Sequence, residues 1–285
     1  MSIFRLDRMT WEEVDGLDRP TTVFFLPVSP IEEHGPHLPL GTDFYGAHDM
    51  AELALQKLEA QAPAWNYVLV PGLPLGCTEM TMEFAGTLSV RGQTLVRVLE
   101  DVCGSIARHG FKYIVLANHH LDLGHVKALH EAIRRVTKRY KIQVVEPAAA
   151  VLYASEPPAL EKTPAQTEVH ADVRETSFIA YRYPDLLKGN YLTLPPVRVD
   201  IAQCFRKGIR TLKRMGAALG YIGSPALATV AQGKQHLEGG AEILASATLK
   251  LMRGETLPQI PKEMQFVLKH FVRLCFATLE RIWAR

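Results

Sequence analysis

The chain has 285 residues, of which 47% are hydrophobic and 22% are charged, and its formal net charge at pH 7 is +2. This apolar content is enough to build a core and excludes intrinsic disorder, and the balanced charge argues against a surface for nucleic acid. No apolar run approaches the roughly 18 residues of a membrane-spanning helix, and residues 1–15 mix both charge signs, unlike a signal peptide.

Strands and helices alternate along the first half of the chain. Short apolar runs predict buried strands, and apolar residues at helical spacing predict helices. The predicted strands cover 22–28, 67–70, 112–117 and 142–145, and the predicted helices cover about 43–60, 95–106 and 126–136. This alternation predicts an α/β fold, a three-layer α/β/α sandwich around a mostly parallel sheet. Ligands bind such sheets beyond the carboxyl ends of the strands.

The rest of the chain is expected to complete a single domain over residues 1–260. The stretch 154–167 is rich in Pro, Ala and Glu, which is typical of a surface loop rather than of a flexible linker. Apolar residues among basic ones then predict a C-terminal helix over 261–285 that packs on the domain or lies at a subunit contact. These apolar residues are Phe266, Val267, Phe271, Leu274, Leu279 and Ile282.

The four cysteines are widely spaced, without a C-x-x-C pair, and therefore do not indicate a disulfide scaffold. They are Cys77, Cys103, Cys204 and Cys275. Free thiols of this kind are typical of a reducing compartment, so we expect a cytoplasmic protein.

The first cluster of acids and histidines directly follows the strand predicted at 22–28. Glu32 and His34 alternate, so an extended loop points both side chains to one side, and these are ligands for Zn²⁺, Mn²⁺ or Fe²⁺. The glycine and prolines that follow can turn the loop and return Asp43 as a bridging third ligand. Alternatively, Glu32 and His34 face solvent and Asp43 only caps a helix.

The second cluster follows the strand predicted at 112–117. His120 and Asp122 repeat the alternating geometry, and a polar cluster at the end of a buried strand is unusual unless it serves a site. The alternative is a histidine hydrogen-bonded to backbone carbonyls, with Asp122 capping the next helix.

Two further segments carry weaker signals. If residues 170–177 are helical, His170 and Arg174 share a face, with Glu175 beside them; the alternative is an ordinary surface helix. The glycines and hydroxyls of residues 76–88 suit a loop that a ligand approaches closely, or a plain turn. The candidates for substrate contact there are Thr78, Gly86 and Thr87.

Residues 27–43, P-V-S-P-I-E-E-H-G-P-H-L-P-L-G-T-D, resemble the signature of the creatininase (creatinine amidohydrolase) family. N-H-H-L-D at 118–122 and H-A-D-V-R-E-T-S at 170–177 follow in the order expected of that family. The resemblance spans roughly residues 20–240. It implies an α/β/α domain with a dinuclear metal centre, assembled as a hexamer or a smaller homo-oligomer.

The resemblance also implies a set of metal ligands. Glu32 and His120 would bind one metal, His34 and Asp122 would bind the other, and Asp43 would bridge them. The cofactor would be two divalent ions per subunit, of Zn, Mn or Fe, since carboxylate and imidazole accept all three. We interpret His37 and His119 as supports of such ligands, because a metal-bound histidine needs a partner on its other ring nitrogen.

The resulting hypothesis is an amidohydrolase that cleaves a non-peptide C–N bond in a cyclic amide or formamide. A water that bridges the metals would lose a proton near neutral pH and attack the carbonyl. Asp122 would also accept a proton, and His170 would protonate the leaving nitrogen while Glu175 orients its ring. The expected partner is a small amide, and neither nucleic acid nor a membrane.

Departures from the family pattern argue against creatinine itself as the substrate. Leu121 stands at an aromatic position of creatininase, and Ser29 and Val173 lie where the family motifs carry other residues. Two alternatives remain: a non-catalytic metal- or ligand-binding oligomer of the same fold, and a nucleotide-formamide deformylase. The deformylase would need a phosphate site, and the motifs are accompanied by no P-loop or basic cluster.

Overall fold

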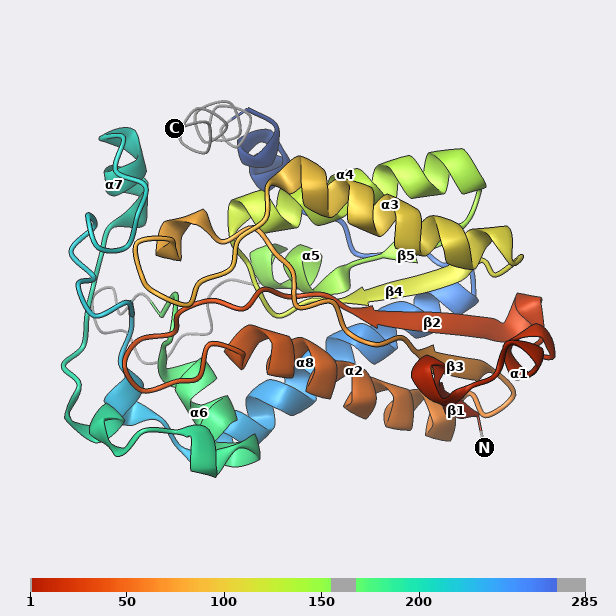
Figure 1. The fold of residues 1–285 in the computed structure, drawn as a ribbon, viewed down its shortest axis with the longest axis horizontal. Coiled ribbons are helices and arrows are strands. Elements are labelled where there is room, and N and C mark those ends of the chain that lie inside the picture. The colour runs from red at the N-terminus through yellow and green to blue at the C-terminus, as the bar shows by residue number, and fades with distance from the viewer. Residues whose placement is uncertain (1, 155–167, 271–285) are drawn as a thin grey trace.

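The computed structural model describes residues 2–154 and 168–270, and its centre is a five-stranded parallel sheet (Figure 1). The strand order is β1-β3-β2-β4-β5. The strands are β1 Ile3–Arg5, β2 Thr22–Pro27, β3 Asn66–Leu69, β4 Tyr113–Ala117 and β5 Gln143–Val145. Four of them lie where the apolar runs predicted, with ends shifted by one residue. The additional strand β1 has only three residues, too few to show a pattern.

Both faces of the sheet are buried. Side chains alternate between the two faces of a strand. Val23 and Phe25 of β2 belong to the apolar cluster on one face, and Phe24 and Leu26 belong to the cluster on the other. This double burial explains why the strands read as continuous apolar runs rather than as alternating patterns.

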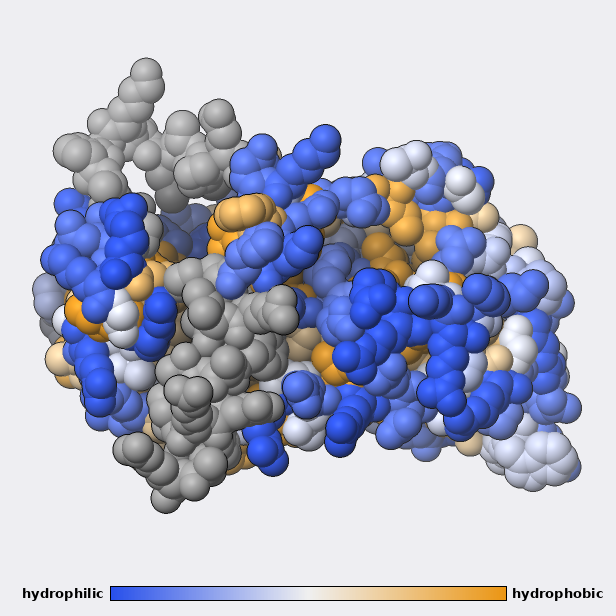
Figure 2. All heavy atoms as spheres, turned by 90° about the horizontal axis from the view of Figure 1, so that it is seen from above, coloured by the Kyte–Doolittle hydropathy of each residue, from blue (hydrophilic) through white to orange (hydrophobic). Residues whose placement is uncertain are grey.

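Helices cover the two faces and complete a three-layer α/β/α sandwich (Figure 1), which confirms the predicted fold class. Helices α2, α6 and α8 pack together on one face, and α3 packs with α4 on the other. Their bounds are α2 Thr42–Gln61, α3 Gly92–Arg108, α4 Leu123–Tyr140, α6 Val173–Arg182 and α8 Val230–Met252. Viewed from the side of α3 and α4, the surface is mostly hydrophilic with scattered apolar patches (Figure 2).

Shorter elements connect these layers. Three shorter α-helices are α1 Trp11–Asp15, α5 Pro147–Ala154 and α7 Ile201–Arg206. Short 3-10 helices lie at Leu6–Arg8, Arg19–Thr21, Glu79–Thr81, Pro184–Leu186, Gly189–Thr193 and Pro225–Leu227. The segment between α6 and α8 is mostly irregular and returns to the sheet edge through a bridge between His170 and Ile222.

The beginning of the predicted C-terminal helix lies against its own chain. Residues 262–270 are helical, and Leu268 packs with Val126 of α4 and Ala149 of α5. Phe271, Leu274, Leu279 and Ile282 lie outside the described residues. So does the predicted loop over 154–167, except for Ala154, which is the last residue of α5. Within the described part of the chain, no helix has both the length and the apolar character needed to span a membrane.

Candidate metal centre

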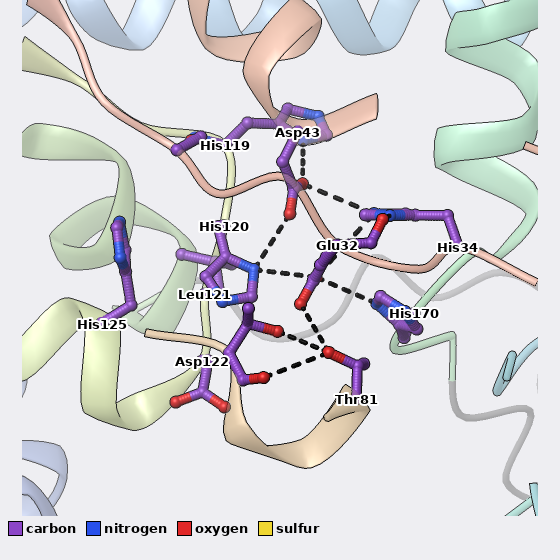
Figure 3. Close-up of polar contacts among 12 residues, drawn as sticks. Glu32, His34, Asp43, Thr81, His119, His120, Leu121, Asp122, His125 and His170 are labelled. Carbon is purple, nitrogen blue, oxygen red and sulfur yellow. Dashed lines mark hydrogen bonds and ion pairs between the residues drawn. The ribbon is translucent and has the colours of Figure 1, made fainter. Parts of the chain in front are cut away.

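The loops that follow β2 and β4 meet at the carboxyl edge of the sheet, because these two strands are paired neighbours. The loop after β2 carries Glu32 and His34 and leads into α2, whose first turn holds Asp43. The loop after β4 carries His120. All four side chains are buried and converge on one point (Figure 3).

Glu32, Asp43 and His120 form a first group of ligand atoms. His120 Nδ1 lies 3.1 Å from Glu32 Oε1 and 3.0 Å from Asp43 Oδ2. One ligand atom from each residue lies within 4.8 Å of the other two. This spacing places two carboxylates and one imidazole around a single point.

Asp43 belongs also to a second group, with His34 and Glu175. His34 Nε2 lies 3.7 Å from Asp43 Oδ1 and 3.8 Å from Glu175 Oε2. Asp43 therefore directs Oδ2 toward the first group and Oδ1 toward the second. A carboxylate in this position can bridge two cations, as in two-metal hydrolytic sites.

Backbone carbonyls fix which ring nitrogens face the centre. His34 Nδ1 donates to the carbonyl of Glu32 at 3.1 Å, and His120 Nε2 donates to the carbonyl of Cys77 at 3.0 Å. A carbonyl oxygen only accepts, so these nitrogens carry the hydrogen and a neutral ring keeps a lone pair on the opposite nitrogen. Metal-bound histidines are held in the same way.

Three buried polar atoms at this point have no hydrogen-bond partner among the described residues. They are Glu32 Oε1, His34 Nε2 and Asp43 Oδ2. Buried polar atoms are almost always hydrogen-bonded, so three such atoms facing one point indicate that a ligand binds there. Carboxylate oxygen and imidazole nitrogen are the donors that zinc, manganese and iron accept. The residues present therefore fit divalent cations.

The carboxylates give the centre a field that favours positive charge. Burial lowers the pKa of His34, but Asp43, Glu175 and Glu32 together outweigh it and raise this pKa to about 10. Burial raises the pKa of Asp43, whereas the charge of the neighbouring His34, the hydrogen bond from His119 and the proximity of the His120 ring hold this pKa well below its usual range. The same negative field would stabilise a bound cation.

His170 borders the centre from the segment before α6. It is not helical, since α6 begins at Val173 and His170 forms the bridge to Ile222, so the predicted helical face shared with Arg174 does not exist. His170 Nε2 is hydrogen-bonded to the carbonyl of Glu33 at 2.8 Å and to its carboxylate at 3.1 Å. The opposite nitrogen, Nδ1, lies 3.6 Å from Glu32 Oε1 and so faces the centre.

Glu33 is a site residue that the sequence did not single out. It holds the His170 ring, while its own backbone N–H donates to Thr87 Oγ1 at 3.1 Å. Its carboxylate lies against the bare backbone of Gly220, where an added Cβ would overlap Glu33 Oε2. Glu33 is adjacent to Glu32 in the sequence, and spacing alone does not show that Glu32 belongs to a ligand group while Glu33 holds His170.

Glu175 and Asp122 relate differently to the centre. Glu175 Oε2 accepts a hydrogen bond from Ala171 N at 2.6 Å and joins the second ligand group. Asp122 caps α4, with Oδ1 accepting from Gly124 N at 2.7 Å, and it belongs to none of the ligand groups found among the described residues. Figure 3 shows its carboxylate directed away from Glu32 and Asp43.

The threonines of the loop after β3 support the ligands. Thr78 and Thr81 share a hydrogen bond of 2.7 Å between their hydroxyls, and Thr81 Oγ1 donates to Glu32 Oε2 at 3.1 Å. Sequence reasoning missed Thr81, since a hydroxyl in a loop gives no spacing signal. Gly86 has a φ of +92° and approaches Leu40. Contact of Thr78, Gly86 and Thr87 with a substrate stays a prediction.

Three further histidines surround the ligands. His37 Nε2 is hydrogen-bonded to Thr176 Oγ1 at 2.9 Å, and burial together with the charge of His34 lowers its pKa to about 4. His119 Nδ1 is hydrogen-bonded to Asp43 Oδ1 at 2.9 Å, and His119 Nε2 lies 2.8 Å from Nε2 of His236 on α8. His236 was missed because a lone histidine on a helix forms no motif.

The sequence matches a family model over most of its length. The matching family is Creatininase, described as creatinine amidohydrolase, over residues 7–248. A creatinine amidohydrolase of Pseudomonas putida is 25% identical over 203 residues, which are 65% of this chain and 74% of the relative. A mycofactocin precursor peptide peptidase of Mycolicibacterium smegmatis is 29% identical over 216 residues, 74% of this chain and 77% of the relative.

Solved structures share the fold. One described as "Creatininase Mn" is 24% identical, with a TM-score of 0.64, and the match covers 88% of this chain and 98% of that one. A mutant creatininase of "Zn-Zn type" is 22% identical, with a TM-score of 0.66 and coverage of 86% and 97%. These likenesses establish the three-layer architecture independently of the sequence motifs.

Proposed function

The chain belongs to the creatininase family, and from that premise we propose that it is a hydrolase of carbon–nitrogen bonds that holds two divalent metals per subunit. One observation carries the proposal: buried atoms of Glu32, His34 and Asp43, without hydrogen bonds from residues 2–154 and 168–270, face one another at the carboxyl edge of the sheet. The first metal would lie among Glu32, Asp43 and His120. The second would lie among His34, Asp43 and Glu175.

This assignment uses Glu175 where the family resemblance implied Asp122. The support is geometric, since Glu175 Oε2 lies 3.8 Å from His34 Nε2 whereas Asp122 caps α4. In the proposal Asp122 therefore holds the start of α4 and the adjoining loop that carries His120. Acceptance of a substrate proton by Asp122 stays a prediction.

Divalent metals in such a centre supply water that ionises near neutral pH and polarise the carbonyl that is attacked. The chain's own residues supply the remaining steps. Asp43 sets the separation of the two positions, and Thr81 orients the Glu32 carboxylate. His170, fixed through Nε2 by Glu33, presents Nδ1 to the centre and donates a proton to the leaving nitrogen. Without that proton an amide nitrogen is a poor leaving group.

The proposed substrate class is a small amide, cyclic amide or formamide. Creatinine itself is not the substrate we propose, because Leu121, Ser29 and Val173 depart from the creatininase pattern. A second candidate class is a short peptide, favoured by the relatives named mycofactocin precursor peptide peptidase. Oligomeric assembly and a cytoplasmic location stay predictions of the sequence.

The test is the metal content per subunit, measured by elemental analysis on protein purified without oxygen. We expect about two equivalents of Zn, Mn or Fe in the wild type and a sharp loss in Asp43→Ala. Glu146→Gln is the matched control, because Glu146 is equally buried but pairs with His130 outside the ligand groups. Near-zero metal in the wild type that does not rise when metal is added would contradict the proposal and favour the non-catalytic alternative.

The metal-loaded protein would then be assayed against cyclic amides, formamides and short peptides. Ring opening of cyclic amides, or release of formate and an amine from formamides, supports the first substrate class if it is absent in Asp43→Ala. Cleavage of peptides alone would move the assignment to the second class while leaving the metal centre in place.

A further inference from the structure

A pair of histidines lies behind the carboxylate that is proposed to bridge the metals. His119 follows β4, and His236 lies on α8, far away in the sequence. His119 Nδ1 is 2.9 Å from Asp43 Oδ1, and its Nε2 is 2.8 Å from His236 Nε2. Figure 3 shows the His119 ring on the opposite side of the Asp43 carboxylate from His120.

We propose that His119 and His236 act as a positioning relay that orients Asp43 and makes the two metal positions unequal. The inference rests on the proposed two-metal function, and it concerns residues that belong to none of the ligand groups found among the described residues. Three features of the structure carry it: the direction of the hydrogen bonds, the packing of the ring and the division of the Asp43 oxygens.

The direction of the hydrogen bonds follows from what each group can donate. An ionised carboxylate only accepts, so His119 Nδ1 carries the hydrogen. A neutral imidazole has a single ring hydrogen, which leaves His119 Nε2 as an acceptor. His236 must then donate from Nε2. In this way His236 selects the tautomer of His119 that can donate to Asp43, just as second partners fix the tautomer of histidines in other sites.

Packing prevents the His119 ring from turning away. The side chain is 4% exposed. On one side, a Cβ added at Gly46 of α2 would lie 2.6 Å from His119 Cδ2, so the ring touches bare backbone there. Phe178 of α6 lies beside it, with ring centroids 5.8 Å apart. The glycine thus provides the space that the ring occupies, and the N–H of His119 stays aimed at Asp43.

The relay treats the two oxygens of Asp43 differently. Oδ1 accepts from His119 and lies 3.7 Å from His34 Nε2, on the side of the second ligand group. Oδ2 has no hydrogen-bond partner among the described residues and lies on the side of His120. Oδ1 therefore accepts a hydrogen bond from His119 in addition to facing the second ligand group. Oδ2 faces only the first ligand group. We expect the second metal position to depend on the relay more than the first.

The test compares His236→Leu, which removes the donor, with His236→Gln, whose amide keeps an N–H donor. Cobalt(II) serves as the probe, since its visible absorption reports ligand geometry and calorimetric titration resolves the two binding steps. Removing such a supporting partner typically weakens metal binding by about 10–100-fold. In His236→Leu we expect this loss of affinity for one of the two cobalt equivalents, together with a changed visible absorption band. In His236→Gln we expect the affinity and the band to return toward the wild-type values. His130→Leu is the control, because His130 pairs with Glu146 away from the centre.

Gly46→Ala supplies an independent variant if His236→Leu fails to fold. It displaces the His119 ring without removing any polar group and should weaken the same equivalent. Two equal, undisturbed cobalt sites in folded His236→Leu and Gly46→Ala would overturn the relay and leave the metal centre standing. A wild-type protein that binds no cobalt would instead overturn the proposed function, and the relay with it.

Discussion

Two buried carboxylates on helix α2 have opposite surroundings. Asp49 has a protein partner for each oxygen: Arg182 Nε lies 2.7 Å from Oδ2, and the Tyr183 hydroxyl lies 3.0 Å from Oδ1. Asp43, at the start of the same helix, has no hydrogen bond to Oδ2 from the part of the chain that the structure describes. Both side chains are almost fully buried. The difference separates a carboxylate whose two oxygens are both hydrogen-bonded within the fold from one that keeps an oxygen available to a ligand.

His170 also has two different sides: Nε2 is hydrogen-bonded to Glu33, whereas Nδ1 faces the centre, 3.6 Å from Glu32 Oε1. We expect His170→Ala to lower kcat by about 10²–10⁴-fold, the usual contribution of a general acid, while the metal content stays at the wild-type value. Glu33→Gln should lower kcat less than His170→Ala does, because the backbone carbonyl of residue 33 still accepts the hydrogen bond from His170 Nε2. Steady-state kinetics measure kcat, and elemental analysis of the same samples measures the metal content. Parallel loss of metal and activity in His170→Ala would make this histidine a ligand instead.

Added metal should stabilise the fold only through the carboxylate that lacks a protein partner. A ligand that binds only the native state at 100 times its Kd adds about 2.7 kcal/mol to the free energy of unfolding. We expect a gain of this order for the wild type and for Asp49→Asn, and little gain for Asp43→Asn. Thermal unfolding of metal-stripped protein, with and without added metal, measures it. An equal increase in stability on adding metal in all three proteins would show that Asp43 contributes no more to metal binding than Asp49 does.

Thr81 allows a test at a single carboxylate oxygen. Its hydroxyl donates to Glu32 Oε2, whereas Oε1 accepts no hydrogen bond from the described residues. Thr81→Val keeps the side-chain shape and removes the hydroxyl. We expect about 10–100-fold weaker metal binding, confined to the group of Glu32, Asp43 and His120. Calorimetric titration checks this, with Thr211→Val as control because Thr211 bonds to Glu83 instead. Unchanged affinity would mean that Glu32 is oriented by its backbone alone.

The smallest expected effect concerns Asp49 and pH. Burial raises the pKa of Asp49, but hydrogen bonds from His48, Arg182 and Tyr183 outweigh it, so the folded-state pKa lies below the ordinary value. Its stabilising contribution is therefore complete above pH of about 4 and disappears as the pH falls through the folded-state pKa. Because Arg182 is 42% exposed, we expect only about 1 kcal/mol. Urea unfolding at pH 6 and pH 3 should show Asp49→Asn less stable than wild type at pH 6, with a smaller difference at pH 3.

The sheet was predictable because it is buried on both faces. Runs such as residues 22–27 and 113–117 are continuously apolar, and the helices between them carry clear apolar spacing. The strand β1 and the long helix α8 were not predicted. The first is very short, and the second mixes small residues with only three widely spaced leucines on its buried face, which makes its apolar spacing weak.

The ligand-bearing loops were predictable because their residues are close in the sequence and follow strands. Glu32, His34 and Asp43 lie within one segment, and His120 follows the neighbouring strand. The residues that support them were not predictable in the same way. Thr81 and His236 reach the centre only through tertiary packing, and a single threonine or histidine carries no spacing that could reveal this.

Gly220 bears on how an inactive descendant of this protein would be recognised. Glu33, which is hydrogen-bonded to the histidine proposed as the general acid, rests against this glycine, whose φ is +78°. Any side chain at 220 would collide with the carboxylate and displace the histidine, although position 220 lies outside every motif of the chain. A copy with such a change would still display all the ligands and the histidine itself, and a search by motif would count it among the working enzymes.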